Sequence, residues 1–435
     1  MAYQIPWRKA EALSKSGPIG NSADLLSDGP TEGRQVLALG WQHRLRALKG
    51  KRGLTPPLAM AVRAGADNGV CPILRWRVSP HYRSEVSSSL ITGFALLSMA
   101  GELSFDISAD WTGISQLNIL RFDVSDVASD EVRKFAIDEF DRKDRFHLET
   151  LKLVDVYFKR HFNRDAVAAL PQELRQKVRP LGLTFSCSGG NSRKLLTLAV
   201  LISAASRLVR EGVGGAKSAL LQFNENIRHV AKMLPQSDFE RVADDGVRHD
   251  VLFQTRLWPD EPDGSVDRSE VNRERCELVA ALRSAFGSED TIGIIPTAFG
   301  EQHAAHLTLR RDIKRSVYLR QLRSTLIAVN TQGLDGSPGL KVAEALAAGC
   351  ALVSQPLNCD LLEPLLPGIN YLPFETPEEC VAQCRVLLAN EALRDRMRAA
   401  NADYFARFTR PDAHARNILA LVLGANSRNG PAQMH

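Results

Sequence analysis

From residue 73 onward, the sequence alternates between short apolar runs and longer stretches whose apolar residues recur at helical spacing. An apolar run of about four to eight residues, bounded by turn residues, is typical of a buried strand. Strands that alternate with helices favour parallel sheets covered by helices, so we predict an α/β fold. The expected strands are residues 73–78, 117–124, 134–137, 154–158 and 181–186 in the first half, and 251–255, 292–295, 325–330, 351–354 and 371–374 in the second.

The length of 435 residues exceeds one ordinary core, so two such units are expected. A long helical stretch over 191–233, with a glycine cluster at its centre, separates them. We place the first domain at 69–247, with this stretch as a helical connector, and the second at 248–424. The expected remainder is a flexible basic N-terminal extension at 1–68 and a C-terminal tail at 425–435.

The composition is that of a globular protein, with 44% hydrophobic and 24% charged residues. A formal charge of +5 suits an anionic ligand such as a nucleotide, or an acidic membrane surface, and is too small to indicate nucleic acid. The apolar runs are shorter than the roughly 20 residues that span a bilayer. Seven scattered cysteines without a Cys-x-x-Cys pair favour a reducing compartment. We therefore expect a cytoplasmic protein.

A basic stretch at residues 41–52 interleaves Arg and Lys with Trp41, Leu45 and Leu48. It has two interpretations. It is either an amphipathic segment that rests on anionic lipid, peripheral to the inner membrane, or a solvated terminal extension.

The segment 333–349 is the most informative for function. A strand leads into a turn with Gly333, Gly336 and Gly339, and the turn leads into a helix. Glycines allow a ligand to approach the backbone closely, and the N-terminus of the helix offers free N–H groups that favour a phosphate. Lys341 in the first helical turn suits an anion nearby, and Glu344 lies on the same face. The alternative is an ordinary αβ turn with a surface Lys-Glu pair.

Residues 337–354 resemble the Glu-Ala-Leu-Ala-Ala-Gly segment of GT-B glycosyltransferases, followed by its strand. Residues 253–258 with 273–287 resemble the first βα unit of the nucleotide-sugar domain of that family, and 370–374 with 376–388 resemble the segments that follow. The resemblance is good over about 250–425. It is thinner over 73–190, where 154–160 and 179–183 are similar to poorly characterised bacterial members. It implies two Rossmann-like parallel-sheet domains that face a cleft.

The resemblance also implies roles for individual residues. Glu344 would hold the nucleotide ribose, and Arg256, at the end of a strand, would give a cation to the leaving group. The turn residues expected at the diphosphate are Ser337, Pro338, Gly339 and Lys341. No Asp-x-Asp pair occurs, so we expect a metal-independent enzyme whose one co-substrate is a nucleotide-diphosphate sugar, without another cofactor. The alternative for Arg256 is a surface arginine at a strand end.

Two departures from the family pattern leave the stereochemistry open. Many retaining members carry a Glu eight residues before the ribose Glu, where this chain has Gly336 beside Asp335. Many also carry a Lys shortly after the first-strand Arg, whereas this chain has no Lys between Lys232 and Lys314. Lys341, Lys314 and Arg315 are candidates for that role.

The acceptor side is expected on the first domain, with a glycan or a lipid-linked acceptor. If the reaction inverts the anomeric carbon, a base must take the proton of the acceptor hydroxyl. We name His81, Asp126 and Asp141 as candidates, among strand ends that also offer Asp123 and Asp138. The alternative is that His81 and Asp126 cap helices. Lys159 and Arg160 are either phosphate ligands or surface charges.

The sequence thus predicts a glycosyltransferase, with bacterial surface polysaccharide synthesis as the expected setting. Two alternatives remain at this stage. One is a sugar-nucleotide epimerase on the same scaffold, and the other is a non-catalytic GT-B-like protein that binds glycan or membrane.

Overall fold

The computed structural model describes residues 62–64, 71–84, 88–114, 118–125, 131–241, 246–260, 268–311, 313–333 and 336–424. Within these ranges the chain forms two sheets, one of seven strands and one of five, each packed against helices. The predicted α/β class with two sheets is therefore confirmed.

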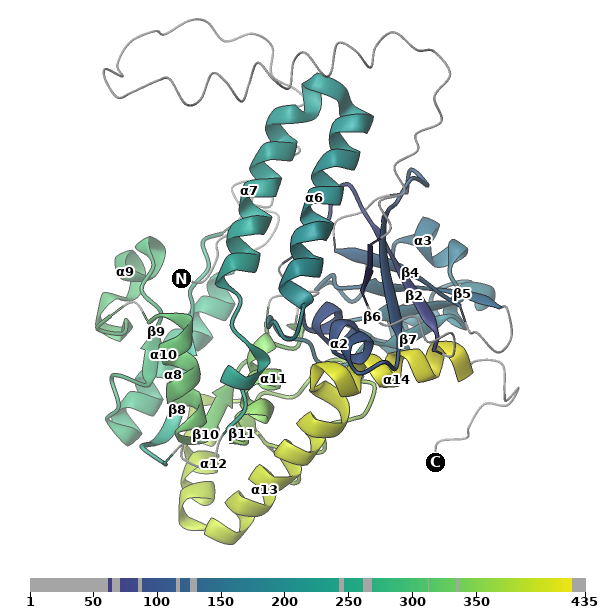
Figure 1. Cartoon of the computed structure of the whole chain (residues 1–435). Helices are drawn as coiled ribbons and strands as arrows, with labels where there is room; N and C mark the ends of the chain where they lie inside the picture. The colour runs from purple at the N-terminus through teal and green to yellow at the C-terminus, as the bar shows by residue number, and fades with distance from the viewer. Residues whose placement is uncertain are drawn as a thin grey trace, which may run out of the picture. The chain divides into compact units, whose positions relative to one another are not determined.

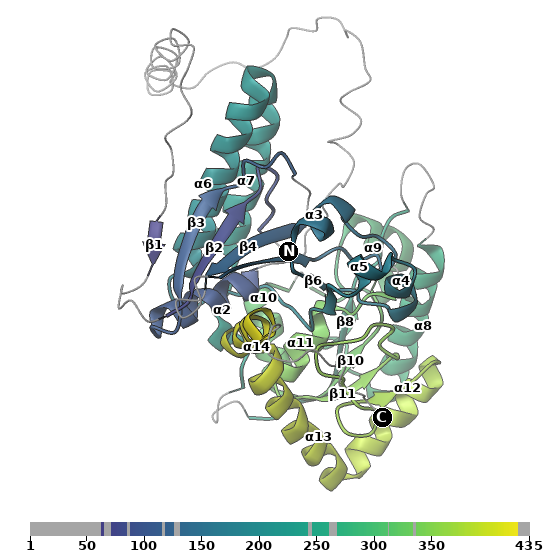
Figure 2. The same ribbon diagram turned by 90° about the vertical axis from the view of Figure 1, so that its right-hand side faces the viewer.

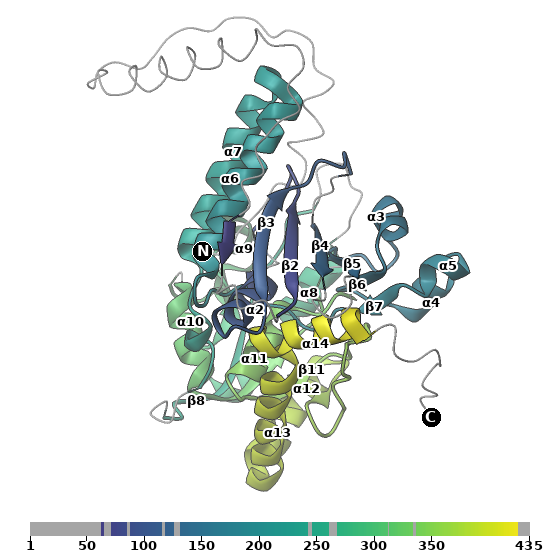
Figure 3. The ribbon, with the colours of Figure 1, turned by 45° about the vertical axis from the view of Figure 1, so that its right-hand side comes forward.

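The first sheet has the strand order β1-β3-β2-β4-β5-β6-β7, and Figure 3 shows β3, β2 and β4 side by side. Its strands are β1 (Val62–Ala64), β2 (Ile73–Val78), β3 (Ser104–Ala109), β4 (Ile119–Ser125), β5 (Val132–Asp138), β6 (Val156–Lys159) and β7 (Val178–Pro180). Strands β2, β3, β5, β6 and β7 run in one direction, whereas β1 and β4 run against their neighbours. The sheet is therefore mixed, where the sequence predicted a parallel one.

The short connection between β4 and β5 explains the antiparallel strand. Only residues 126–131 separate the two strands, and a parallel pair needs a crossover of about a dozen residues or more. The predicted strand at 181–186 is also wrong. Strand β7 ends at Pro180. The Leu181 N–H makes one more hydrogen bond, to the Lys159 carbonyl at 3.0 Å, and the chain then leaves the sheet.

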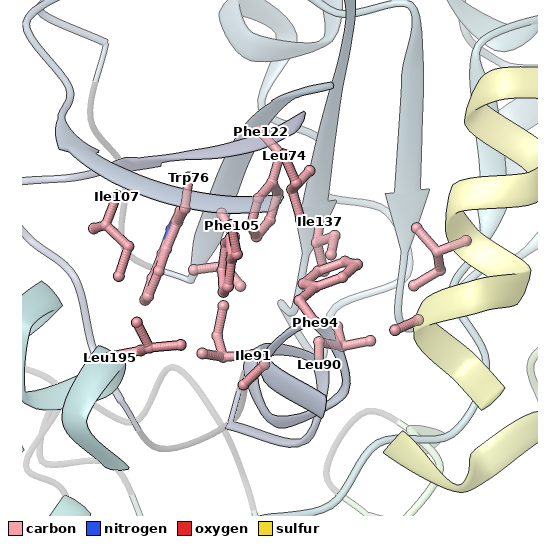
Figure 4. Close-up of a cluster of buried hydrophobic side chains, with 14 of the residues drawn as sticks. Leu74, Trp76, Leu90, Ile91, Phe94, Phe105, Ile107, Phe122, Ile137 and Leu195 are labelled. Atoms are coloured by element: carbon pink, nitrogen blue, oxygen red, sulfur yellow. The ribbon is translucent and has the colours of Figure 1, made fainter. Parts of the chain in front are cut away.

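Helix α2 (Ser88–Met99) packs under this sheet, and its crossover makes β2 and β3 parallel. Leu90, Ile91 and Phe94 point from α2 toward strand residues such as Trp76 and Phe105, as Figure 4 shows. Phe122 and Phe135 stack with ring centroids 4.9 Å apart in the same core. Smaller helices follow the sheet: α3 (Leu148–Leu153), α4 (Arg164–Ala168) and α5 (Gln172–Arg175).

A helical hairpin follows β7. Its arms are α6 (Ser192–Glu211) and α7 (Ala216–Lys232), joined by the 3₁₀ turn η2 (Gly212–Gly215). The two helices run side by side, away from α2 and α14, in Figures 1 and 2. The helical stretch predicted over 191–233, with its central glycine cluster, is confirmed. Gly212 adopts a φ of 63° at the turn, a conformation that favours glycine. The short η3 (Gln236–Asp238) follows the hairpin.

The second sheet is parallel throughout, as predicted, with the order β12-β11-β10-β8-β9. Its strands are β8 (His249–Thr255), β9 (Ile292–Ile294), β10 (Thr325–Asn330), β11 (Ala351–Ser354) and β12 (Leu372–Pro373). Its helices are α8 (Ser269–Phe286), α9 (Ala298–Ala304), η4 (Ala305–Leu307), α10 (Arg315–Arg323), α11 (Leu340–Ala347), α12 (Pro377–Ala389) and α13 (Glu391–Tyr404). A capping box formed by Thr376 and Glu379 opens α12.

The last helix, α14 (Pro411–Gly424), follows α13 through a π-helical turn, η6 (Phe405–Thr409), and packs in the core of the first sheet. His414 on α14 is buried, and its Nε2 lies 2.6 Å from the Leu181 carbonyl oxygen. The sequence predicted this helix in the second domain, at 248–424. The structure packs it in the core of the first sheet instead.

The expected N-terminal extension lies outside the described residues, apart from Val62–Ala64 in β1, and so does the expected tail at 425–435. None of the helices in the described ranges has the length and apolarity needed to span a bilayer.

We predict that Gly93→Ala on α2 destabilises the protein. A Cβ at this position would lie 2.0 Å from the carbonyl oxygen of Pro411, the first residue of α14, and a backbone atom cannot move aside cheaply. The expected loss is about 1–3 kcal/mol, the usual cost of overpacking. The midpoint of urea unfolding measures it. Gly214→Ala in the hairpin turn, where a Cβ meets no atom within 4 Å, is the control. Equal stability of both variants would contradict the packing of α14 on α2.

Candidate functional site

The loop between β10 and α11 has the geometry of a close-approach turn. The Gly333 N–H donates to the Ser337 carbonyl at 2.9 Å, and Gly336 has a φ of 72°. A Cβ on Gly333 would lie 2.7 Å from Ser337 Oγ, so the loop folds tightly on itself. Gly339 caps α11 without a side-chain hydrogen bond. The N–H of Val342 donates to the Gly339 carbonyl at 3.1 Å, and the cap residue has no side chain that could bond the N–H groups before it. Asp335 lies outside the described residues.

Glu344 is buried one turn into α11, with 1% of its side chain exposed. Arg315, the first residue of α10, donates to both of its carboxylate oxygens, with one bond of 3.2 Å and one shorter contact. The Arg315 guanidinium also lies 5.4 Å from the ring of Tyr318 and is 41% exposed. Glu344 is therefore buried, and it does not form the surface Lys-Glu pair of the alternative interpretation.

Lys341 points into the same site. Its Nζ donates to the carbonyl of Gln254 on β8 and lies 6.0 Å from the centre of the Tyr318 ring. The pKa of Lys341 is lowered to about 7, mainly by burial; the nearby arginines also lower it, and Glu344 opposes them. The arginines that act on it are Arg275, Arg256 and Arg315.

Arg256 and Arg275 add two more buried cations, each about 7% exposed. Arg256 follows β8, with its guanidinium 5.6 Å from the Trp258 ring. Arg275 on α8 donates to the Arg256 carbonyl at 2.7 Å and to the Gln332 carbonyl at 3.3 Å. Burial, and then the charge of Arg256, lowers the pKa of Arg275 to about 10. Arg256 is therefore not a surface arginine.

We call Arg256, Arg275, Arg315 and Lys341 the cation cluster. These groups repel one another, and the carboxylate that opposes them at Lys341 is that of Glu344. Holding four cations around one carboxylate, with Arg256 and Arg275 buried, is costly unless further negative charge offsets it. The cluster surrounds the N-terminus of α11, whose dipole also favours an anion. Chemically, such an arrangement is suited to a group with more than one negative charge.

Sequence reasoning missed Arg275. A signal was present, because Arg275 lies on the same helical face as Leu278, Val279 and Leu282, which are buried. A charged residue in an apolar stripe needs a reason. Here the reason is the pair of backbone carbonyls, one at the end of β8 and one in the loop before α11.

Arg160 connects this loop to the first sheet. It follows β6, is buried, and donates to the Pro338 carbonyl at 3.0 Å. Its other terminal nitrogen pairs with Asp141, which follows β5. The structure thus brings Pro338 and Asp141 together through Arg160, and Asp141 is part of an ion pair. Arg160 is not a surface charge.

The structure places the other acceptor-side candidates apart from this pair. His81, after β2, lies 3.9 Å from Glu211 at the end of α6, and burial and Arg207 lower its pKa. Asp123 on β4 pairs with Arg77 on β2 at 2.8 Å. Because β4 is antiparallel to β2 and β5, its C-terminal end lies at the opposite edge of the sheet from theirs. Asp126 lies outside the described residues.

Asp138 and Lys159 form a buried pair at 3.0 Å, to which the Tyr157 hydroxyl donates at 2.6 Å. This contact ties the ends of β5 and β6 together, so Lys159 is neither a surface charge nor an exposed phosphate ligand.

Glu139 is a buried carboxyl that sequence reasoning did not single out. It follows Asp138 and is 4% exposed, and its Oε1 has no hydrogen-bond partner. The pKa of Glu139 is raised to about 8, mainly by burial; Arg160 opposes this rise, and Asp138 and Asp141 contribute to it. A proton-holding group thus lies in the electrostatic range of Arg160, the residue that contacts the Pro338 loop.

A cavity of about 640 Å³ lies elsewhere, at the C-terminal end of α11, lined by residues such as Arg241, Gly349 and Arg398. It includes none of the predicted site residues. Arg241 and Arg398 donate to backbone carbonyls there. In the described part of the chain, no three His, Cys, Asp or Glu side chains gather as ligands for a metal ion.

We predict that Glu139→Gln flattens the pH dependence of stability. The folded chain keeps the Glu139 proton up to a pKa of about 8, whereas the unfolded chain loses it near 4.5. Wild-type stability should therefore fall as pH rises through this window, by up to about 1.4 kcal/mol per pH unit from this group. Urea unfolding at several pH values between 5 and 8 measures the slope. Glu391→Gln, at an exposed carboxylate, is the control. Identical slopes for wild type and Glu139→Gln would refute the assignment.

Comparison with known proteins locates the similarity in the second half of the chain. Residues 273–420, about a third of the chain, match a family model described as Glycosyl transferase-like. A search of curated protein sequences finds no significant match.

Solved structures with remote similarity include three bacterial proteins. The C-terminal domain of a glycosyl transferase group 1 family protein (LpcC) from Francisella tularensis is 13% identical, with a TM-score of 0.27, over 39% of this chain and 95% of that one. A UDP-GlcNAc 2-epimerase from Neisseria meningitidis, bound to UDP-GlcNAc, is 12% identical, with a TM-score of 0.32, over 66% and 69%. A glycosyltransferase from Rickettsia africae is 11% identical, with a TM-score of 0.32, over 65% and 79%.

Similarity as remote as this defines neither a substrate nor a reaction. The family match extends from α8 to α14 and includes Arg275, Arg315, Lys341 and Glu344, so most of the cation cluster lies within it. The resemblance to GT-B glycosyltransferases is therefore confirmed for residues 273–420, which form a glycosyl transferase-like segment.

Proposed function

We propose that the protein transfers a sugar from a nucleoside-diphosphate sugar to a hydroxyl group of a glycan or lipid-linked acceptor, without a metal ion, in the synthesis of a bacterial surface polysaccharide. The observation that carries the proposal is the cation cluster around buried Glu344 at the N-terminus of α11. A diphosphate brings negative charge to these cations.

The departing nucleoside diphosphate gains negative charge as the sugar leaves. Arg256, Arg275 and Lys341 are already held in place, by strand ends and backbone carbonyls, before any ligand arrives. Fixed cations at the point where charge develops lower the barrier without reorganisation, and this is the work that a metal ion does in other transferases. Metal independence rests on this argument.

Arg315 and Glu344 have linked roles in the proposal. Glu344 is the candidate ribose ligand, and Arg315 occupies both of its oxygens in the free chain. The diphosphate competes for the half-exposed Arg315 guanidinium, which frees Glu344 to accept hydrogen bonds from ribose hydroxyls. In the complex, the ion pair between Arg315 and Glu344 is thus replaced by two contacts with the nucleotide sugar: Arg315 with the diphosphate and Glu344 with the ribose.

The acceptor belongs on the side of the first sheet in this proposal. Arg160 holds Asp141 next to the Pro338 carbonyl, so a carboxylate lies at the loop where the donor would bind. Asp141 is the candidate for accepting the proton of the acceptor hydroxyl, and buried Glu139 is a second proton-holding group nearby. His81 lies at the hairpin and is the weaker candidate.

We predict that Arg256→Met and Lys341→Met each lower the rate of sugar transfer by about 10²–10³, the usual effect of removing one group that stabilises developing charge. The test is to incubate the purified chain with a panel of nucleotide sugars and candidate acceptors, and to measure the release of nucleoside diphosphate and the glycosylated product. EDTA should leave the rate unchanged.

Arg320→Met, at an exposed cation on α10, is the matched control and should retain activity. Appearance of an epimerised sugar nucleotide without transfer would replace the proposal by an epimerase. Full activity of Arg256→Met and Lys341→Met would remove its physical basis.

We also predict that nucleotide-sugar affinity falls as pH rises above about 7. The pKa of Lys341 is about 7 in the free chain, and a bound diphosphate favours its charged form, so binding takes up a proton above that pH. The charged groups that act on Lys341 are Glu344 and the three arginines of the cluster. The change is at most about tenfold per pH unit for one proton.

Titration calorimetry in two buffers of different ionisation enthalpy measures this proton uptake. A nucleotide sugar is the correct ligand, because its esterified phosphates do not titrate in this range. Lys341→Arg keeps the charge and should remove the dependence. Undiminished proton uptake in Lys341→Arg would contradict the role of Lys341.

A further inference from the structure

The α6–α7 hairpin exposes large aliphatic side chains to solvent. Their exposed fractions range from 43% to 68%, and the residues are Leu201, Leu208, Val209, Leu220 and Leu221. Trp111, in the loop after β3, is 48% exposed and lies 5.7 Å from the guanidinium of Arg210 on α6. Apolar surface gathered on a projecting element marks an interaction site, because isolated exposed residues are ordinary and a cluster is not.

The opposite side of the hairpin is already occupied. Near the base, Leu195, Leu196 and Val230 belong to the core of the first sheet. Near the turn, Gln222 donates to the Tyr82 carbonyl at 2.8 Å, and Arg210 donates to the Asp110 carbonyl at 2.5 Å. The exposed aliphatic side chains therefore lie on the face that no described element covers.

The hairpin also carries an excess of positive charge. Its two helices contain seven basic residues and two acidic ones, a formal net charge of +5, which equals the +5 of the entire sequence. The basic residues are Arg193, Lys194, Arg207, Arg210, Lys217, Arg228 and Lys232, and the acidic ones are Glu211 and Glu225. A surface of this charge attracts an anionic partner and repels a second copy of itself.

The mixture of side chains identifies the partner as lipid. Aliphatic and basic residues share the solvent face of α7, where Lys217, Leu220, Leu221 and Arg228 are exposed within three turns, together with Asn224 and Glu225. Long basic side chains reach lipid phosphates while their apolar neighbours enter the acyl boundary, and a tryptophan suits the same interface.

We propose that the solvent face of the α6–α7 hairpin, with Trp111, docks on an anionic lipid surface. The turn end of the hairpin lies beside His81 and Asp110, which follow β2 and β3. These strands run parallel to β5, so docking brings the edge of the sheet that carries Asp141 toward the membrane. An acceptor carried on a lipid would then reach the site in the plane of the membrane; this last step rests on the proposed transferase function, and docking itself does not.

Co-sedimentation of the full chain with vesicles tests the proposal. Vesicles of phosphatidylcholine with about a third phosphatidylglycerol should bind the chain at least tenfold more tightly than phosphatidylcholine alone, and high salt should weaken the binding. The variant Leu208→Ser, Val209→Ser, Leu220→Ser, Leu221→Ser should lose at least tenfold in binding. These side chains are exposed, so its melting temperature should match that of the wild type.

Two controls separate other sources of binding. Leu148→Ser with Leu153→Ser, at exposed positions on α3, should bind vesicles as the wild type does. Replacing Arg44, Arg46, Lys49, Lys51 and Arg52 by Gln tests the basic N-terminal stretch and should leave most of the binding. The proposal is overturned if the chain ignores anionic vesicles, or if the hairpin variant binds them as well as the wild type. Either result leaves nucleotide binding, and thus the transferase proposal, untouched.

Discussion

The ion pair between Arg315 and Glu344 is the contact on which the candidate site depends. It buries a carboxylate at the start of α11 and keeps a guanidinium within range of Lys341. Without Glu344, Lys341 would have only arginines around it, and its pKa, already about 7, would fall further. The pair thus offsets part of the repulsion among these cations, and in the proposed function a bound diphosphate would offset more of it.

The two halves of the chain are connected at this site through backbone carbonyls. Arg160 of the first half donates to the Pro338 carbonyl of the second, and His414 on α14, which packs in the first core, lies within hydrogen-bond distance of the Leu181 carbonyl. Contacts of this kind specify the position of a loop without depending on the side chains that the loop carries. Pro338 and Leu181 take part in these contacts through their backbone carbonyls, although their side chains carry no polar group.

The sequence predicted the parallel second sheet, the hairpin and the loop before α11, because these follow from local patterns: apolar runs, a glycine cluster and glycines before a helix. It did not predict the antiparallel β4, since strand direction depends on the length of a connection that composition does not mark. Nor did it predict Arg275, Glu139 or the partners of Arg160. Their roles arise from contacts between residues such as Arg160 and Pro338, which lie 178 positions apart. The candidate donor residues were found through the resemblance, whereas the charge balance that gives them meaning required the structure.

The most direct test of the central claim is the melting temperature of the purified chain with a nucleoside diphosphate, compared with the same nucleoside without phosphates, each with and without EDTA. If the cation cluster is a diphosphate site, one nucleoside diphosphate at about 100 times its dissociation constant should add about 2.7 kcal/mol of stability. The nucleoside alone should add far less, and EDTA should change nothing. If no nucleoside diphosphate shifts the melting of a cooperatively folded chain, the cluster is not a donor site, and the account of its charges is wrong.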